Sequence, residues 1–183
     1  RHMSIYFWHR LRVLQNFILY GKLICVVIAK KRKIRRILAI KNRAIGDTVL
    51  LTGSLRLLKQ HFPDHQLHVL ARFPGGQLLE GLPFIDRVIC ADEPKGSIDR
   101  MAYWFRMIRR LREQFYVMTL NFHASFRTAV TAKLLRTDNC IANHHEINGR
   151  NWFSDVPVPG RGVVKPVIDR DLDVLRAIGI ASN

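Results

Sequence analysis

The chain has 183 residues, of which 48% are hydrophobic, so it can bury a continuous core and is not a disordered tail. Its 30 Lys and Arg against 14 Asp and Glu give a net charge of +16, which favours nucleic acid, an anionic membrane or a phosphorylated substrate as partner. Three cysteines, Cys25, Cys90 and Cys140, lie far apart in apolar stretches and suggest neither a disulfide framework nor a metal site, which fits a reducing cytoplasm.

The first predicted element is a basic and apolar helix over residues 1–33, in which Arg1 to Met3 resemble the remnant of an expression tag. The apolar run from Phe17 to Ala29 contains Lys22 and is shorter than the roughly 20 residues that span a bilayer. A basic cluster follows this run, whereas in a signal peptide it comes first. Two interpretations stay open: a helix that lies in the surface of an anionic membrane, and a helix that packs on the rest of the protein.

From residue 34 onward, β-like runs alternate with helical segments, which predicts a Rossmann-like α/β domain with a parallel sheet flanked by helices. The predicted strands are residues 36–41, 67–71, 87–91, 116–120 and 139–142. The predicted helices are residues 46–61, 74–81, 98–114, 125–135 and 168–177. We expect the inner face of the first of these helices to carry Val49, Leu50, Leu57 and Leu58. The third should carry arginines on its outer face, and residues 148–164, which contain Pro157 and Pro159, are expected to form a loop.

The loop after the first predicted strand places an acidic residue at the start of a helix. In a parallel α/β sheet the functional groups gather at the carboxyl ends of the strands, where helix N-termini present backbone N–H groups. Gly46 permits a tight turn or a close approach, and Asp47 lies in the first helical turn, where the helix dipole favours an ionised carboxylate. From the pattern alone two roles for Asp47 are open, a helix cap and a general base for a substrate hydroxyl.

Residues 37–52, ILAIKNRAIGDTVLLT, resemble the opening strand and glycine–aspartate loop of the bacterial lipopolysaccharide heptosyltransferases, glycosyltransferase family nine. Similar stretches follow in the family's order: residues 55–63, which end in Phe-Pro, LEGLPFIDRVI at 79–89, and residues 152–159. The resemblance covers about residues 34 to 180. It implies the GT-B fold, in which two Rossmann-like domains face each other across a cleft, the first binding the acceptor and the second the nucleotide sugar.

The resemblance also implies an activity, the transfer of heptose from ADP-heptose to the lipopolysaccharide inner core with inversion. Asp47 matches the residue that is the family's proposed base, which takes the proton from the acceptor hydroxyl. The acceptor side of the first loop would then be lined by Lys41, Arg43, Ala44, Ile45 and Gly46, although Lys41 and Arg43 could equally be solvated. No cofactor or metal is expected, because the chain has neither a phosphate-binding glycine motif nor a zinc-ligand spacing.

The loop after the predicted strand 116–120 departs from the family pattern. Family members often carry an aspartate there and a glycine further on, and this chain has Asn121 and Ala124 instead. His123, Ser125 and Arg127 remain where acceptor contacts are expected, and a purely structural role is the alternative for His123.

Arg150 lies where the family resemblance places an acceptor-binding arginine. A guanidinium group suits this role because it can bind a phosphate or carboxylate group with two hydrogen bonds. The alternative is an ordinary surface arginine.

By resemblance, residues 34–183 form the acceptor-side half, and the second, nucleotide-sugar domain is absent from the chain. We therefore expect the chain to be inactive alone, to meet ADP-heptose only through a C-terminal domain, and to lie in the cytoplasm, peripherally on the inner membrane. The alternative is a non-catalytic basic module that binds an anionic membrane or nucleic acid, using the N-terminal helix and Arg109, Arg110, Arg112 and Arg136. Nucleic acid is not the expected partner, because no aromatic residues alternate with basic ones on a strand platform.

Overall fold

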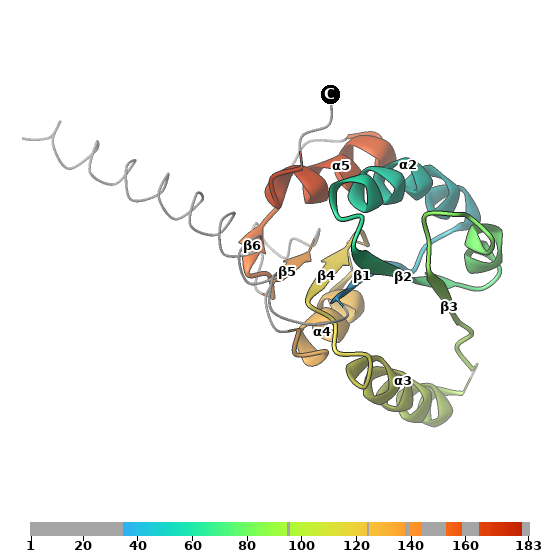
Figure 1. Ribbon diagram of the computed structural model, residues 1–183. Coiled ribbons are helices and arrows are strands. Elements are labelled where there is room, and N and C mark those ends of the chain that lie inside the picture. Colours follow the sequence, from blue (N-terminus) through green and yellow to red (C-terminus); the bar gives the residue numbers. More distant parts are fainter. Residues whose placement is uncertain are drawn as a thin grey trace, which may run out of the picture.

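The computed structural model describes residues 35–94, 96–123, 125–137, 140–143, 153–158 and 165–180. The expected N-terminal helix over residues 1–33, Ala124 and Arg150 lie outside these residues. Within the described parts, the strands form one parallel sheet in the order β3-β2-β1-β4-β5-β6. Helices lie on both faces of this sheet (Figure 1). The predicted Rossmann-like architecture is therefore confirmed.

The first half of the domain follows the predicted alternation closely. It contains β1 (Arg35–Lys41), α2 (Ile45–His61), β2 (His65–Arg72), the short 3-10 helix η1 (Gly75–Leu79) and β3 (Arg87–Ala91). β1 is central and reads as a nearly continuous apolar run because both of its faces are covered. Its residues Ile37 and Ala39 face one layer of helices, and Leu38 and Ile40 face the other.

The second half differs from the prediction in two places. It contains α3 (Ser97–Arg112), β4 (Met118–Asn121), α4 (Phe126–Leu134), β5 (Cys140–Asn143), β6 (Val156–Pro157) and α5 (Val167–Ala177). β4 begins later than predicted, although Val117 is already buried and its N–H group donates to the carbonyl of Arg36 at 2.9 Å. The expectation of a loop throughout residues 148–164 was wrong, because β6 pairs with β5 there.

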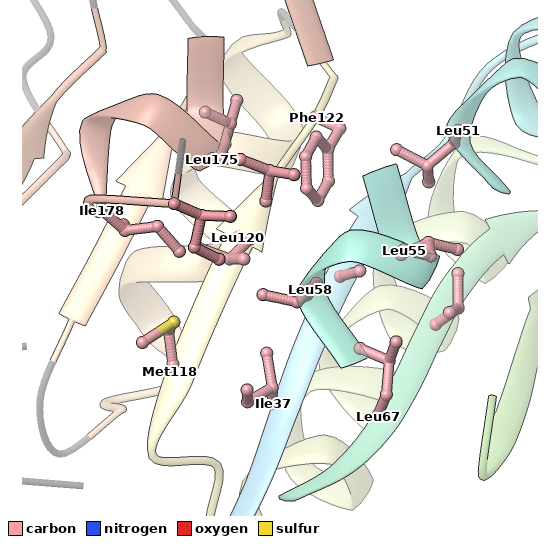
Figure 2. Close-up of a cluster of buried hydrophobic side chains, with 14 of the residues drawn as sticks. Ile37, Leu51, Leu55, Leu58, Leu67, Met118, Leu120, Phe122, Leu175 and Ile178 are labelled. Atoms are coloured by element: carbon pink, nitrogen blue, oxygen red, sulfur yellow. The ribbon is translucent and has the colours of Figure 1, made fainter. Parts of the chain in front are cut away.

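One face of the sheet is covered by α2 and α5. Leu51, Leu55 and Leu58 of α2 point toward the sheet, where they meet β1, β2 and β4, as Figure 2 shows. Each of the three is fully buried, and burying a leucine side chain contributes roughly 1.5–3 kcal/mol. The predicted inner face was wrong in part, since Val49 and Leu50 are 45% and 43% exposed.

The other face of the sheet is covered by α3 and α4, through residues that include Ile108, Leu111 and Ala132. As a result, the helices that follow the neighbouring strands β1 and β4 pack on opposite faces of the sheet. In open α/β sheets this arrangement opens a crevice beyond the carboxyl ends of the two strands, where ligands bind. None of the helices in the described parts of the chain is long and apolar enough to cross a membrane.

Candidate functional site

Two loops lie at the carboxyl ends of β1 and β4. The first is residues 42–44 after β1, and the described part of the second is residues 122–123 and 125 after β4. Ile40 is paired with Asn121 across the two strands, and the N–H group of Phe122 donates to the carbonyl of Ile40 at 2.9 Å. The two loops that the sequence singled out are therefore neighbours in the fold, although they are far apart in the sequence.

Asp47 lies in the first turn of α2, at this edge. The N-cap residue is Ala44, which has no side-chain cap, so the interpretation of Asp47 as the helix cap was wrong. A carboxylate oxygen of Asp47 lies 3.3 Å from Nε of Arg43, and the two side chains are 22% and 41% exposed. Such an exposed pair contributes at most about 1 kcal/mol to stability, so the carboxylate can exchange this partner for another. Asp47 is thus an anionic, partly accessible group at a helix N-terminus.

Gly46 and its neighbours form the exposed part of the first loop. Ala44, Ile45 and Gly46 are all exposed, and a Cβ atom added to Gly46 would meet nothing within 4 Å. Gly46 is the second residue of α2, so its expected tight turn is absent and its backbone is helical. The open space above Gly46 leaves room for a ligand next to Asp47.

Lys41 is the last residue of β1 and is buried, with 1% of its surface exposed. Its ammonium group donates to the two carboxylate oxygens of Asp171 on α5, at 2.5 and 2.7 Å. Burial lowers the pKa of Lys41, while the charges of Asp171 and Asp47 oppose that change. Burial raises the pKa of Asp171 to about 6, against the effect of Lys41. Lys41 therefore lies beneath the surface that an acceptor would reach, and its partner in the structure is Asp171.

Two polar groups near this pair were not anticipated from the sequence. Arg170 interacts electrostatically with Lys41 and Asp171, and its Nε atom is buried without a hydrogen-bond partner among the described residues. The side-chain oxygen of Asn42 is likewise buried and unpartnered within the described parts.

Asp171 was also missed from the sequence, where its only signal was a charged residue on the inner side of the predicted helix 168–177. Its partner lies 130 positions away, so no local pattern could identify it.

The second loop is built by hydrogen bonds among its own side chains. The buried amide of Asn121 donates to Oγ1 of Thr128 at 3.1 Å and accepts from the N–H group of His123 at 3.1 Å. Ser125 is the N-cap of α4, and its Oγ accepts from the N–H group of Thr128 at 3.3 Å. Oγ1 of Thr128 in turn donates to the carbonyl of His123 at 3.0 Å. Asn121 and Ser125 thus shape the loop that presents the partly buried His123 at the sheet edge.

Arg127 connects this loop to the next one. Its Nη1 atom lies 2.7 Å from a carboxylate oxygen of Glu93, which follows β3. Because the Arg127 side chain is 49% exposed, an anionic ligand could replace Glu93 as its partner. The structure therefore brings Asp47, His123, Ser125 and Arg127 to one edge of the sheet.

Comparisons with known proteins agree with this fold. No protein-family model matches the chain. Over 143 residues the chain is 26% identical to lipopolysaccharide heptosyltransferase 3 of Escherichia coli, covering 75% of this chain and 41% of that protein. The crystal structure of the glycosyl transferase family 9 from Veillonella parvula DSM 2008 has a TM-score of 0.67 and 19% identity, covering 80% of this chain and 42% of the other. The chain is thus similar in sequence to a lipopolysaccharide heptosyltransferase and in fold to a family nine glycosyltransferase.

A further structural neighbour is the E. coli heptosyltransferase WaaC, solved with ADP. Its TM-score is 0.61 and its identity 14%, covering 80% of this chain and 48% of WaaC. The chain thus spans less than half of the length of each of these three proteins. The expected heptosyltransferase resemblance is confirmed, and the structural likeness establishes the Rossmann-like fold of the matched part.

Proposed function

We propose that this chain is the acceptor-side half of an inverting glycosyltransferase that transfers heptose from ADP-heptose to the lipopolysaccharide inner core. The observation that carries the proposal is the position of Asp47, a partly exposed carboxylate at a helix N-terminus beside the switch point of the sheet. The similarity to lipopolysaccharide heptosyltransferase 3 supports the choice of sugar and acceptor.

In the proposed reaction Asp47 acts as general base. Its carboxylate takes the proton of an acceptor hydroxyl as the hydroxyl oxygen attacks the anomeric carbon of the heptose. The bond between that carbon and the ADP oxygen breaks, ADP leaves with the electron pair, and the configuration at carbon is inverted. A helix N-terminus suits this role because it stabilises the ionised carboxylate that must be present before the attack.

The acceptor is proposed to lie between the two loops. Arg43, Ala44, Ile45 and Gly46 would contact it from the β1 side, where Gly46 leaves open space. His123, Ser125 and Arg127 would contact it from the β4 side, and Arg150 is proposed to bind an anionic group of the core. Lys41 is buried, so its proposed role becomes that of a positioning residue that fixes the end of β1 through Asp171.

The proposal also covers the binding of the donor and the location of the protein. ADP-heptose is proposed to be held by a C-terminal domain of the family kind, facing residues 34–183 across a cleft. Because the donor is a soluble nucleotide sugar and the acceptor is anchored in lipid, we place the protein at the cytoplasmic face of the inner membrane.

The test is sugar transfer from ADP-heptose to a lipid A–inner-core acceptor, with this chain joined to a C-terminal family nine domain. Transfer that is lost in Asp47→Ala while folding and acceptor binding persist supports the proposal. The chain by itself is expected to transfer no sugar. Salt-dependent DNA binding that Asp47→Ala leaves unchanged, together with no transfer, would favour the non-catalytic basic module instead.

A further inference from the structure

The N-terminal part of α3 carries an exposed apolar stripe. Ile98, Met101 and Phe105 are 83%, 53% and 57% exposed, and their spacing of three and four residues places them on one side of the helix. α3 lies on the opposite side of the sheet from α2 and α5 (Figure 1). Large apolar side chains that gather on an exposed helix face mark an interaction surface.

The stripe is not needed to attach α3 to the domain. The helix is attached through its C-terminal half, where Ile108 and Leu111 are buried and Met107 and Trp104 pack against the same core. The indole N–H group of Trp104 also donates to Oγ1 of Thr131 on α4 at 2.9 Å. These contacts attach α3 to the domain without Ile98, Met101 and Phe105, which lie nearer its N-terminus.

The same helix is strongly basic. It contains five arginines and one aspartate, and the exposed arginines are Arg106, Arg109, Arg110 and Arg112. Arg109 has an acidic neighbour in Glu113 at 3.7 Å, which offsets one of these positive charges. The exposed side of α3 thus combines apolar side chains with a positive charge.

We infer that α3 is a docking surface for an anionic lipid bilayer. Ile98, Met101 and Phe105 enter the boundary between headgroups and acyl chains, and the arginines contact lipid phosphate groups. The apolar stripe favours a bilayer over nucleic acid, because a phosphate backbone would contact the arginines and leave the stripe in water. The positive charge favours anionic lipid over an uncharged apolar partner.

Docking through α3 would also position the candidate functional site. α3 follows β3, so its N-terminus lies at the same sheet edge as Asp47. Docking through α3 would therefore hold that edge near a lipid-anchored acceptor. The inference rests on the proposed peripheral location, but it does not depend on the role of Asp47.

The test measures how the full chain partitions onto vesicles of phosphatidylcholine with and without phosphatidylglycerol. One variant combines Met101→Gln with Phe105→Gln, and a second combines Arg106→Gln with Arg110→Gln. Each pair should lower partitioning onto the anionic vesicles at least about tenfold. The matched controls are Leu78→Gln and Arg56→Gln, which change exposed residues of η1 and α2 and should alter partitioning less than about twofold. Circular dichroism checks that every variant is folded.

A photoreactive residue gives an independent readout of insertion. A chain with p-benzoylphenylalanine in place of Phe105 should crosslink to lipid, and one with the same group in place of Leu78 should not. Residues 1–33 are the same in all these proteins, so differences among them report on α3.

The inference is overturned if both α3 pairs bind anionic vesicles like the unchanged chain, or if Phe105 variants instead abolish self-association or DNA binding. Transfer to a water-soluble, delipidated acceptor, measured with this chain joined to a C-terminal family nine domain, separates the two proposals. The α3 pairs should leave it intact, whereas Asp47→Ala should abolish it. Normal vesicle binding with no Asp47-dependent transfer would refute only the proposed function.

Discussion

The ammonium group of Lys41 and the carboxylate of Asp171 form a buried pair that joins the end of β1 to α5, with nitrogen–oxygen distances of 2.5 and 2.7 Å. Both residues are at most 2% exposed, so neither charge can turn to water if the other is removed. The charge of Asp47, in the first turn of α2, also acts on both partners. A contact between distant parts of the chain therefore holds the end of the strand that precedes the proposed base.

Asp171→Ala is expected to lower the free energy of unfolding by about 3–5 kcal/mol, because it leaves the charge of Lys41 buried and unpaired. The double variant Lys41→Met, Asp171→Leu should recover most of this loss, since it removes both charges. Urea denaturation of the two single variants and the double variant measures the coupling. If the double variant lost as much unfolding free energy as the two single variants together, the two charges would not stabilise each other as a pair.

His68 should make stability depend on pH. It is buried, its Nδ1 lies 3.0 Å from the hydroxyl of Tyr116, and burial lowers its pKa to about 4. Because His68 binds its proton more tightly in the unfolded chain, the folded state is favoured most above about pH 6.5. This stabilisation is lost as the pH falls toward 4. The loss amounts to about 3 kcal/mol.

The control for this prediction is His68→Gln, which should remove most of that slope. Asp171 acts in the opposite direction, since its raised pKa of about 6 adds stability as the pH falls below that value. The difference between the unchanged chain and His68→Gln, measured by denaturation from pH 7 to 4, therefore isolates the histidine. An unchanged slope in the variant would show that His68 is not buried as a neutral ring.

Two glycines should respond to alanine in opposite ways. A Cβ atom at Gly76 would lie 2.7 Å from Sγ of Cys90 and 3.4 Å from Cβ of Ala71, so Gly76→Ala should destabilise the domain by about 1–3 kcal/mol. Gly46 has open space and a helical backbone, so Gly46→Ala should raise stability by up to about 1 kcal/mol. Thermal unfolding compares the two. If Gly46→Ala is stable yet impairs transfer, the space above Gly46 is used by substrate.

The sequence identified most strands and helices because short β-like apolar runs alternate with helical segments. It failed for the inner face of α2, where Val49 and Leu50 are exposed and Leu51 and Leu55 are buried. Apolar residues occupy several sides of that helix, so periodicity alone could not set its rotation. β6 was missed because a strand of two residues has no measurable period.

In the candidate site, too, the sequence identified some residues and missed others. Asp47 was identified by the family resemblance, and the structure places it beside the loop of His123, as the parallel sheet implied. Lys41 looked like a surface residue because it opens a polar loop. Its burial depends on Asp171, which comes from the other end of the domain, and such a contact has no local signal.

Ser125 should stabilise α4 as its N-cap. Ser125→Ala removes the acceptor for the N–H group of Thr128 and should cost about 1 kcal/mol, whereas Ser125→Asp keeps an acceptor and should cost little. Chemical denaturation distinguishes the two variants. Equal losses in both would mean that the serine contributes through packing and not through the cap.

The central claim is that Asp47 is the general base of a sugar transfer, and Asp47→Asn tests it with the smallest change of shape. The measurement is the rate of heptose transfer from ADP-heptose, with this chain joined to a C-terminal family nine domain. A loss of about 10²–10⁴-fold in rate, with unchanged acceptor affinity and unfolding free energy, is the predicted result. A rate within a factor of about two of the unchanged protein would contradict the claim.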